Sequence, residues 1–254
     1  MCIRDRYNTE YNIMPLPKIS TPTHELVLPS TGKKIKYRPF LVREEKILIL
    51  ALESQDTKQI TNAIKSTLKS CILTRGIKVE ELPTFDIEYI FLNIRGKSVG
   101  ESVDVVITCP DDGETKVESQ IFIDEIQVQK SEKHSRDITL DESLTLRMKY
   151  PSLNEFVQNN FDITNVDDIT FDASLDIISS CIDVVYNADE SWAASDCTKK
   201  ELNEWLETLN SNQFKQVETF FETMPKLSHT IKVTNPKTKI ESDVTLEGIT
   251  SFFG

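Results

Sequence analysis

The spacing of apolar residues changes twice along the chain, and this limits the fold more than any other feature of the sequence. Residues 42–96 carry apolar positions every three to four residues, as amphipathic helices do. Between residues 103 and 148 apolar and polar residues alternate, which indicates strands, and the helical spacing returns after Pro151. Helical and strand-rich stretches that follow one another predict an α+β protein with small antiparallel sheets.

Residues 14–98 are expected to form an N-terminal β-hairpin followed by three helices. Residues 24–28 and 33–38 alternate on either side of a turn that contains Gly32. Asp56, with a glutamine three residues later, has the spacing of a helix N-cap and predicts the start of the second helix. The inner side of the first helix is predicted to consist of Ile47, Leu48, Ala51 and Leu52.

The remainder of the chain is expected to form two further regions. Residues 99–150 predict a central, small antiparallel β unit, with a turn at Pro110. Residues 151–254 predict an acidic helical region that is closed by a terminal β-hairpin. Within this region the apolar residues of 171–186 favour a single long helix.

The first residues of the chain are set apart from these regions. The opening MCIRDR resembles the translation of a transposase adapter that is used in building sequencing libraries. Residues 1–13 also lack the apolar run of a signal peptide. They are therefore expected to be a disordered tail or a translation artefact, with Met14 as the true start.

The charge of the chain is divided between two segments. Of the 254 residues, 39% are hydrophobic and 28% are charged, and the net charge is −12. Residues 14–82 carry twelve Lys/Arg against seven Asp/Glu, whereas residues 151–210 carry thirteen acids against two lysines. This acidity disfavours a nucleic-acid partner. It suits docking onto basic protein surfaces, or it is a solvated face that keeps the chain soluble.

The sequence predicts neither a membrane span nor a disulfide scaffold. No apolar run approaches the roughly 18 residues that cross a bilayer. The five cysteines are widely spaced, without a CxxC pair, so they are expected to be reduced, as in a cytosolic-type protein.

Signatures of catalysis are missing from the sequence, and the chain is not expected to be an enzyme. It has no GxGxxG, no P-loop and no GxSxG. The three histidines, His24, His134 and His229, lack the spacing of paired metal ligands and are interpreted as surface residues.

The turn Cys109-Pro110-Asp111-Asp112-Gly113 is the strongest chemical signal. A zinc knuckle places two thiolates on one metal with a CPxCG turn, but Asp112 stands at the second position. A similar turn at Asn235-Pro236 has no such ligand. The sequence therefore predicts hairpins that persist without metal, and no cofactor.

Several segments together carry a resemblance to a known family. They are Pro29 to Ala51 (PSTGKKIKYRPFLVREEKILILA), the start MPLPKI, the Cys109 turn, and the closing LEGITSFF. In these the chain resembles the baseplate hub family of T-even-type contractile-tailed bacteriophages, over about residues 14–254. The family is expected to carry Cys-Pro-x-Cys-Gly turns, and the missing second thiol puts any metal role in doubt.

The resemblance implies a virion-assembly protein, either a hub subunit or a hub assembly protein. It implies other phage baseplate or tail proteins as partners, in the host cytoplasm during assembly and in the tail baseplate. The alternatives are a transient chaperone of the tail tape-measure protein, a zinc-binding module and a hub-associated hydrolase. The oligomeric state stays open.

Two segments are predicted to contact partners. The first is the hairpin and helix start, and the second is the pair of terminal aromatics, which serves either as an anchor in a partner pocket or as a plug for the core of this chain. The predicted contact residues are Lys33, Lys34, Lys36, Tyr37, Arg38, Phe40, Arg43, Phe252 and Phe253.

Overall fold

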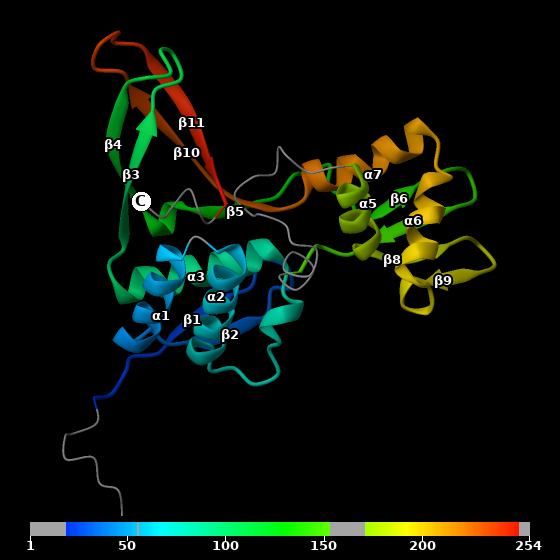
Figure 1. Cartoon of the computed structure of the whole chain (residues 1–254), viewed down its shortest axis with the longest axis horizontal. Coiled ribbons are helices and arrows are strands. Elements are labelled where there is room, and N and C mark those ends of the chain that lie inside the picture. The colour runs from blue at the N-terminus through cyan, green and yellow to red at the C-terminus, as the bar shows by residue number, and fades with distance from the viewer. Residues whose placement is uncertain (1–18, 55, 153–170, 249–254) are drawn as a thin grey trace, which may run out of the picture.

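The computed structural model describes residues 19–54, 56–152 and 171–248, which fold into three parts (Figure 1). The α+β class is confirmed, with small antiparallel sheets. The first part, the N-terminal lobe, contains the predicted hairpin and three helices. Its elements are β1 (His24–Val27), β2 (Lys34–Tyr37), α1 (Val42–Glu53), α2 (Thr57–Cys71), the short 3-10 helix η1 (Val79–Glu81) and α3 (Thr84–Ser98).

Local signals in the sequence explain the elements of this lobe. Asp56 caps α2 as predicted, since its Oδ1 accepts from the Lys58 backbone N–H at 2.9 Å, and its Oδ2 accepts from Gln59 Nε2 at 3.0 Å. The hairpin strands alternate between core and solvent, so their inner residues pack against α2 and α3. The buried cluster includes Leu26, Leu28, Ile35, Tyr37, Leu68, Ile90, Phe91 and Ile94.

Helix α3 is the centre of the molecule. Every residue of α3 except Lys97 is buried or half-buried, as expected for a helix that is covered on every side. Ile90 and Ile94 belong to the core of the N-terminal lobe, whereas Leu92 belongs to the next core. A Cβ on Gly96 would lie 2.9 Å from Cδ1 of Ile123, so glycine permits the close approach between α3 and that core.

The second part, the hairpin unit, joins residues from distant parts of the sequence. Strands β3 and β4 form one antiparallel hairpin, and β10 pairs with both β11 and β5 in a second sheet. Leu227 and Val233 of β10 share a core with Val103 and Val105 of β3. The elements are β3 (Ser102–Thr108), β4 (Lys116–Phe122), η2 (Ile123–Glu125), β5 (Gln127–Gln129), β10 (Lys226–Thr234) and β11 (Glu241–Glu247).

The third part, the C-terminal lobe, packs three helices against a four-stranded antiparallel sheet of order β6-β7-β8-β9. Its buried residues include Leu146, Met148, Leu175, Ile182, Leu206, Val217 and Phe220. Its elements are β6 (Asp137–Thr139), β7 (Thr145–Met148), α5 (Phe171–Ser180), β8 (Ile182–Tyr186), β9 (Ser191–Ala193), η4 (Ala194–Asp196), α6 (Lys199–Glu207) and α7 (Ser211–Thr223).

The prediction of one helix over residues 171–186 is wrong. Helix α5 ends at Ser180, and β8 begins at Ile182 and pairs with β7. The reason is the composition of β8, IDVVY, which is rich in β-branched residues. Its Ile182 and Val185 are buried while Asp183 is exposed, and pairing along the sheet outweighs the helical spacing of the preceding residues.

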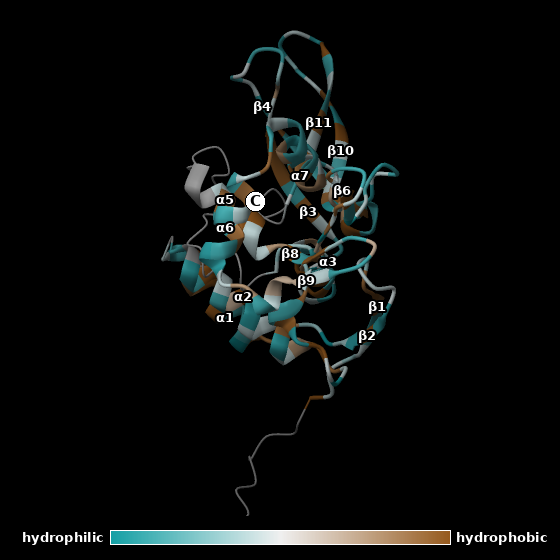
Figure 2. Ribbon diagram, turned by 90° about the vertical axis from the view of Figure 1, so that its right-hand side faces the viewer, coloured by the Kyte–Doolittle hydropathy of each residue, from teal (hydrophilic) through white to brown (hydrophobic). Residues whose placement is uncertain are grey.

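The packing groups the strands differently from the ranges expected for the regions. Strands β6 and β7 lie within residues 99–150, yet they belong to the C-terminal lobe. Strands β10 and β11 lie within residues 151–254, yet they return to the hairpin unit and stand beside β3 and β4 (Figure 1). Apolar segments accordingly occur in all three parts (Figure 2).

A cluster of rings connects the C-terminal lobe to α3, and it corrects the interpretation of His134 as a surface residue. The His134 ring is half-buried, 5.1 Å from Phe220 and 5.5 Å from Tyr150. Its Nε2 lies 3.0 Å from the Tyr150 hydroxyl, and its Nδ1 lies 3.0 Å from Thr223 Oγ1. Tyr150 meets Phe85 of α3 edge-on at 5.1 Å, so the histidine is part of the joint between the lobes.

Candidate functional site

The outer face of the β1–β2 hairpin is basic. Lys33, Lys34 and Lys36, the hairpin lysines, are all exposed, because in β2 the alternate residues Ile35 and Tyr37 take the inner positions. Lys34 and Lys36 both pair with Glu25 across the hairpin, Lys36 at 3.7 Å. Hydrogen bonding and charge from Lys34 lower the pKa of Glu25. Lys33 has no ion-pair partner among the described residues. The outer face of the hairpin therefore carries a net positive charge that a partner protein can contact.

Two residues of the predicted contact set lie inside the fold. We expected Tyr37 on the partner-binding surface, but its side chain is 2% exposed and belongs to the N-terminal core. Burial raises the pKa of its hydroxyl. Phe40 is half-buried against the same core. Side chains alternate between the two faces of β2, so the arrangement that exposes Lys34 and Lys36 also buries Tyr37.

Arg38 and Arg43 converge on one buried carboxylate, that of Glu44. Arg38 Nη2 lies 3.0 Å and Arg43 Nε 2.7 Å from Glu44 Oε1, while Oε2 accepts from the backbone N–H of Leu41 at 2.7 Å. Burial raises the pKa of Glu44, but the hydrogen bonds from Arg38, Arg43 and Leu41 outweigh it and lower the pKa to about 2. This group fixes α1 to the end of β2, and only Arg43, 71% exposed, remains accessible from outside.

Helix α1 turns a partly apolar face outward. The predicted inner side holds for Leu48 and Ala51, whereas Ile47 and Leu52 are each 47% exposed. The helix is apolar at every position from 47 to 52, so periodicity alone does not identify its inner side. The Glu44 contacts decide the rotation. They leave the α1 outer face, which consists of Val42, Lys46, Ile49 and Leu50, in solvent.

The terminal aromatics Phe252 and Phe253 lie outside the described residues, as do residues 1–13. The prediction that Phe252 and Phe253 contact a partner therefore stays a prediction. Of the predicted contact residues, the structure brings Arg38 and Arg43 together on Glu44. The hairpin turn and Phe40 lie at opposite ends of α3, because the Ser30 N–H donates to Asp86 near its start and the Phe40 N–H donates to Ser98 Oγ at its end.

The Cys109 turn and the Asn235 turn are the tips of two neighbouring hairpins. The Gly113 N–H donates to the Cys109 carbonyl, and the Lys239 N–H to the Asn235 carbonyl, both at 2.9 Å. Gly113 and Lys239 both have positive φ, 69° and 65°. Asn235 Nδ2 donates to the two oxygens of Asp111 at 3.1 and 3.0 Å, which links the tips.

These tips do not fit a zinc site. Burial, together with Asp111 and Asp112, raises the pKa of the Cys109 thiol, whereas zinc requires a thiolate. Asp112 accepts the backbone N–H of Thr115 at 2.9 Å instead of standing free as a ligand. Within the part of the chain that is described, no three His, Cys, Asp or Glu residues are grouped to hold a metal ion. The two hairpin tips are joined by the hydrogen bonds between Asn235 and Asp111 instead of by a metal ion.

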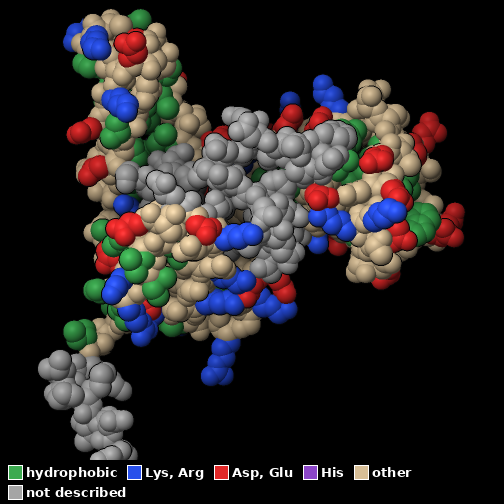
Figure 3. Space-filling model, in the orientation of Figure 1, with side chains coloured by type: hydrophobic (Ala, Val, Ile, Leu, Met, Phe, Trp, Pro, Cys, Tyr) green, Lys and Arg blue, Asp and Glu red, His purple; other side chains and the backbone are tan. Residues whose placement is uncertain are grey.

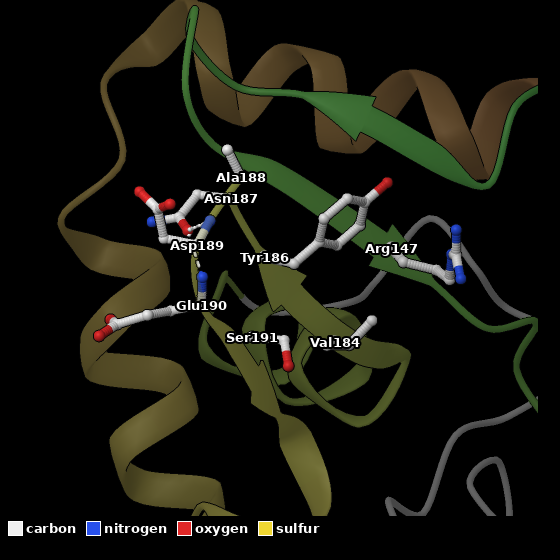
Figure 4. Close-up of a pocket in the computed structure, with 8 residues that line it drawn as sticks. All are labelled: Arg147, Val184, Tyr186, Asn187, Ala188, Asp189, Glu190 and Ser191. Carbon is white, nitrogen blue, oxygen red and sulfur yellow. Dashed lines mark hydrogen bonds between the residues drawn. The ribbon is translucent and has the colours of Figure 1, made fainter.

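A shallow hollow lies beside β9 at the acidic end of the C-terminal lobe (Figure 4). Asn187 Oδ1 accepts from the backbone N–H groups of Asp189 and Glu190 at 2.8 and 2.6 Å, which shapes the β8–β9 turn. Arg147 lies over the Tyr186 ring at 5.5 Å. The residues that line the hollow are Arg147, Val184, Tyr186, Asn187, Ala188, Asp189, Glu190 and Ser191.

Comparison with known proteins identifies the family of the chain. The profile of the family described as T4 bacteriophage base plate protein matches residues 21–254. The chain therefore belongs to that family and is a phage baseplate protein, which places it with other baseplate proteins in the virion tail. Neither the curated proteins nor the solved structures include a match.

Among the described residues, no helix has both the length and the apolar character to cross a membrane.

Proposed function

We propose that this chain is a structural subunit of the baseplate hub, that it acts by docking and not by catalysis, and that the hairpin lysines contact an acidic surface of a neighbouring baseplate protein. The observation that supports this role is the basic outer face of β1–β2, where three exposed lysines face a single carboxylate. A rigid hairpin holds these charges in place, because its inner residues are anchored in the core.

The buried ionisable groups also support a role without catalysis. Glu44 is held by two arginines, Asp86 accepts from the Ser30 backbone N–H at 3.0 Å, and the His134 ring is packed between aromatic side chains. Packing accounts for each shift: burial is outweighed by hydrogen bonds from Arg38, Arg43 and Leu41 that lower the pKa of Glu44, burial raises the pKa of Asp86, and burial with Arg136 lowers the pKa of His134. The proposed partners are other hub and baseplate proteins, without nucleic acid.

The test is capture of partners from phage-infected cells with the tagged full chain. The variant Lys33→Glu/Lys34→Glu/Lys36→Glu is expected to lose the captured baseplate proteins. The matched control, Lys133→Glu/Lys215→Glu/Lys237→Glu, makes the same change of charge at exposed lysines elsewhere and is expected to retain them. Equal capture by both variants would refute docking through the hairpin.

A transient chaperone of the tail tape-measure protein is the second candidate. The observation in its favour is the α1 outer face, since exposed Val42, Ile49 and Leu50 could cover apolar helices of a client before assembly. A chaperone leaves when assembly is complete, whereas a hub subunit stays in the particle. The protein content of finished particles therefore separates the two.

A further inference from the structure

The α1 outer face has a defined chemical character. Val42, Ile49 and Leu50 are 80%, 49% and 54% exposed. Val42, Lys46 and Ile49 follow one another at helical spacing along one side, and Leu50 lies four residues beyond Lys46. Lys46 lies within this face, and Arg43, whose side chain is 71% exposed although it pairs with Glu44, is seven residues from Leu50 and so on the same side of the helix. The acidic Glu53 follows Ile49 by four residues, so the two cations outnumber it beside the aliphatic side chains. Such a face suits an apolar knob that is bordered by carboxylates.

The C-terminal lobe presents a knob of that kind. Trp192 on β9 is 45% exposed, although tryptophan is a large side chain that is normally well covered. Three exposed acidic residues, Asp189, Glu190 and Asp196, lie within four residues of Trp192 in the sequence. None of these three carboxylates has an ion-pair partner within the described residues. We call Asp189, Glu190, Trp192 and Asp196 the Trp192 corner.

The two surfaces belong to opposite ends of the molecule. Figure 1 places α1 and β9 far apart along its longest axis, α1 in the N-terminal lobe and β9 in the C-terminal lobe. Figure 3 shows acidic side chains gathered over the C-terminal lobe and basic ones on the lower side of the N-terminal lobe. The Trp192 corner therefore cannot reach the α1 outer face of its own chain while the fold is intact.

We propose that these two surfaces bind each other between copies of this chain, in a head-to-tail manner. The occupant of the α1 outer face is the Trp192 corner of a second copy, with Trp192 against Val42, Ile49 and Leu50 and the carboxylates beside Arg43 and Lys46. Tryptophan and arginine are the residues that most often dominate interface energies. Because the two patches differ, the contact is heterologous, and repetition yields a ring or an open chain of subunits.

This inference goes beyond the proposed docking function and does not use the hairpin lysines. Its experiment is sedimentation velocity of the purified full chain over a range of concentrations and at low and high salt. The wild-type chain is expected to self-associate, and salt is expected to weaken the association because opposite charges border both surfaces. Leu50→Asp and Trp192→Ala are each expected to weaken it by at least about tenfold.

Mixing the two variants tests the head-to-tail arrangement. Trp192→Ala keeps an intact α1 outer face, and Leu50→Asp keeps an intact Trp192 corner, so a mixture is expected to form a complex of one copy of each that does not grow further. Ile240→Asp changes an equally exposed aliphatic residue in the β10–β11 turn, and it is expected to behave as wild type.

Three results would overturn the inference. The first is a wild-type chain that stays monomeric at every concentration, in which case another protein covers the α1 outer face. The second is association that only Leu50→Asp abolishes, which indicates a symmetric contact between α1 helices. The third is a mixture of the two variants that stays monomeric. Circular dichroism of each variant confirms that the fold is intact.

Discussion

Replacing Glu44 by glutamine is expected to destabilise the fold strongly while changing only a few atoms. The carboxylate is 5% exposed and accepts hydrogen bonds from two guanidinium groups and one backbone N–H. A glutamine has only one acceptor oxygen, so its amide NH₂ must face at least one of these donors. The free energy of unfolding at pH 7 therefore falls.

The pKa of Glu44 gives the size of this effect. A pKa lowered from 4.5 to about 2 corresponds to about 3 kcal/mol of stability when the group is ionised. Because the folded pKa is below the unfolded one, this contribution is complete above pH 4.5 and is lost as the pH falls towards 2. Glu44→Gln is expected to lose about 3 kcal/mol at pH 7 and to show a weaker dependence of stability on pH in that window.

Urea unfolding followed by circular dichroism between pH 7 and pH 3 measures both quantities. Asp86→Asn is the matched control, because burial raises the pKa of Asp86 even though Ser30 donates to it. Loss of its charge is expected to change stability at pH 7 by less than about 1 kcal/mol. Equal losses of stability in both variants, or a wild-type pH dependence in Glu44→Gln, would refute this role of the Glu44 carboxylate.

Three further results are expected. Asn235→Asp places a buried carboxylate against Asp111 and is expected to cost about 2–4 kcal/mol in urea unfolding, more than Asn235→Ala; equal losses would contradict a link between the hairpin tips. Burial and Arg136 lower the pKa of His134, so the wild type is expected to lose stability as the pH falls below 6.5. His134→Gln is expected to lose less stability over the same pH range, and parallel curves of stability against pH would contradict this. Metal analysis of the purified chain is expected to give well below one zinc per chain, and a stoichiometric reading would contradict the account of the Cys109 turn.

Much of the local structure could be predicted because its signals lie close together in the sequence. Asp56 and Thr198 are helix caps whose partners stand three residues further on, and both caps form. The alternation in β2 correctly exposes Lys34 and Lys36. These features depend on neighbouring residues and need no knowledge of the rest of the chain.

The grouping of the strands could not be predicted in this way. The pairing of β10 with β5 joins residues about one hundred positions apart, and no local pattern specifies it. The sequence predicts a helix through the residues of β8, because its partner β7 lies 34 to 41 positions away and leaves no local signal. Tertiary contacts decided both cases.

The candidate site shows the same division. The charge of the hairpin lysines could be predicted from the sequence. The burial of Tyr37 could not, because it depends on which face of the hairpin packs against the core. The outer side of α1 could not be predicted, because residues 47–52 are all apolar and therefore point to every side of the helix. The contacts of Glu44 with Arg38 and Arg43 set the rotation of the helix. A continuous apolar run next to basic residues was the one signal that could have indicated an exposed face.

We propose that this baseplate protein is a hub subunit that stays in the particle. Quantitative mass spectrometry of purified phage particles, compared with lysates of infected cells, tests it most directly. We expect peptides from residues 19–248 in finished particles, in a fixed ratio to the other baseplate proteins. Their absence from particles that assemble normally, together with abundance in the lysate, would contradict the claim and favour the chaperone.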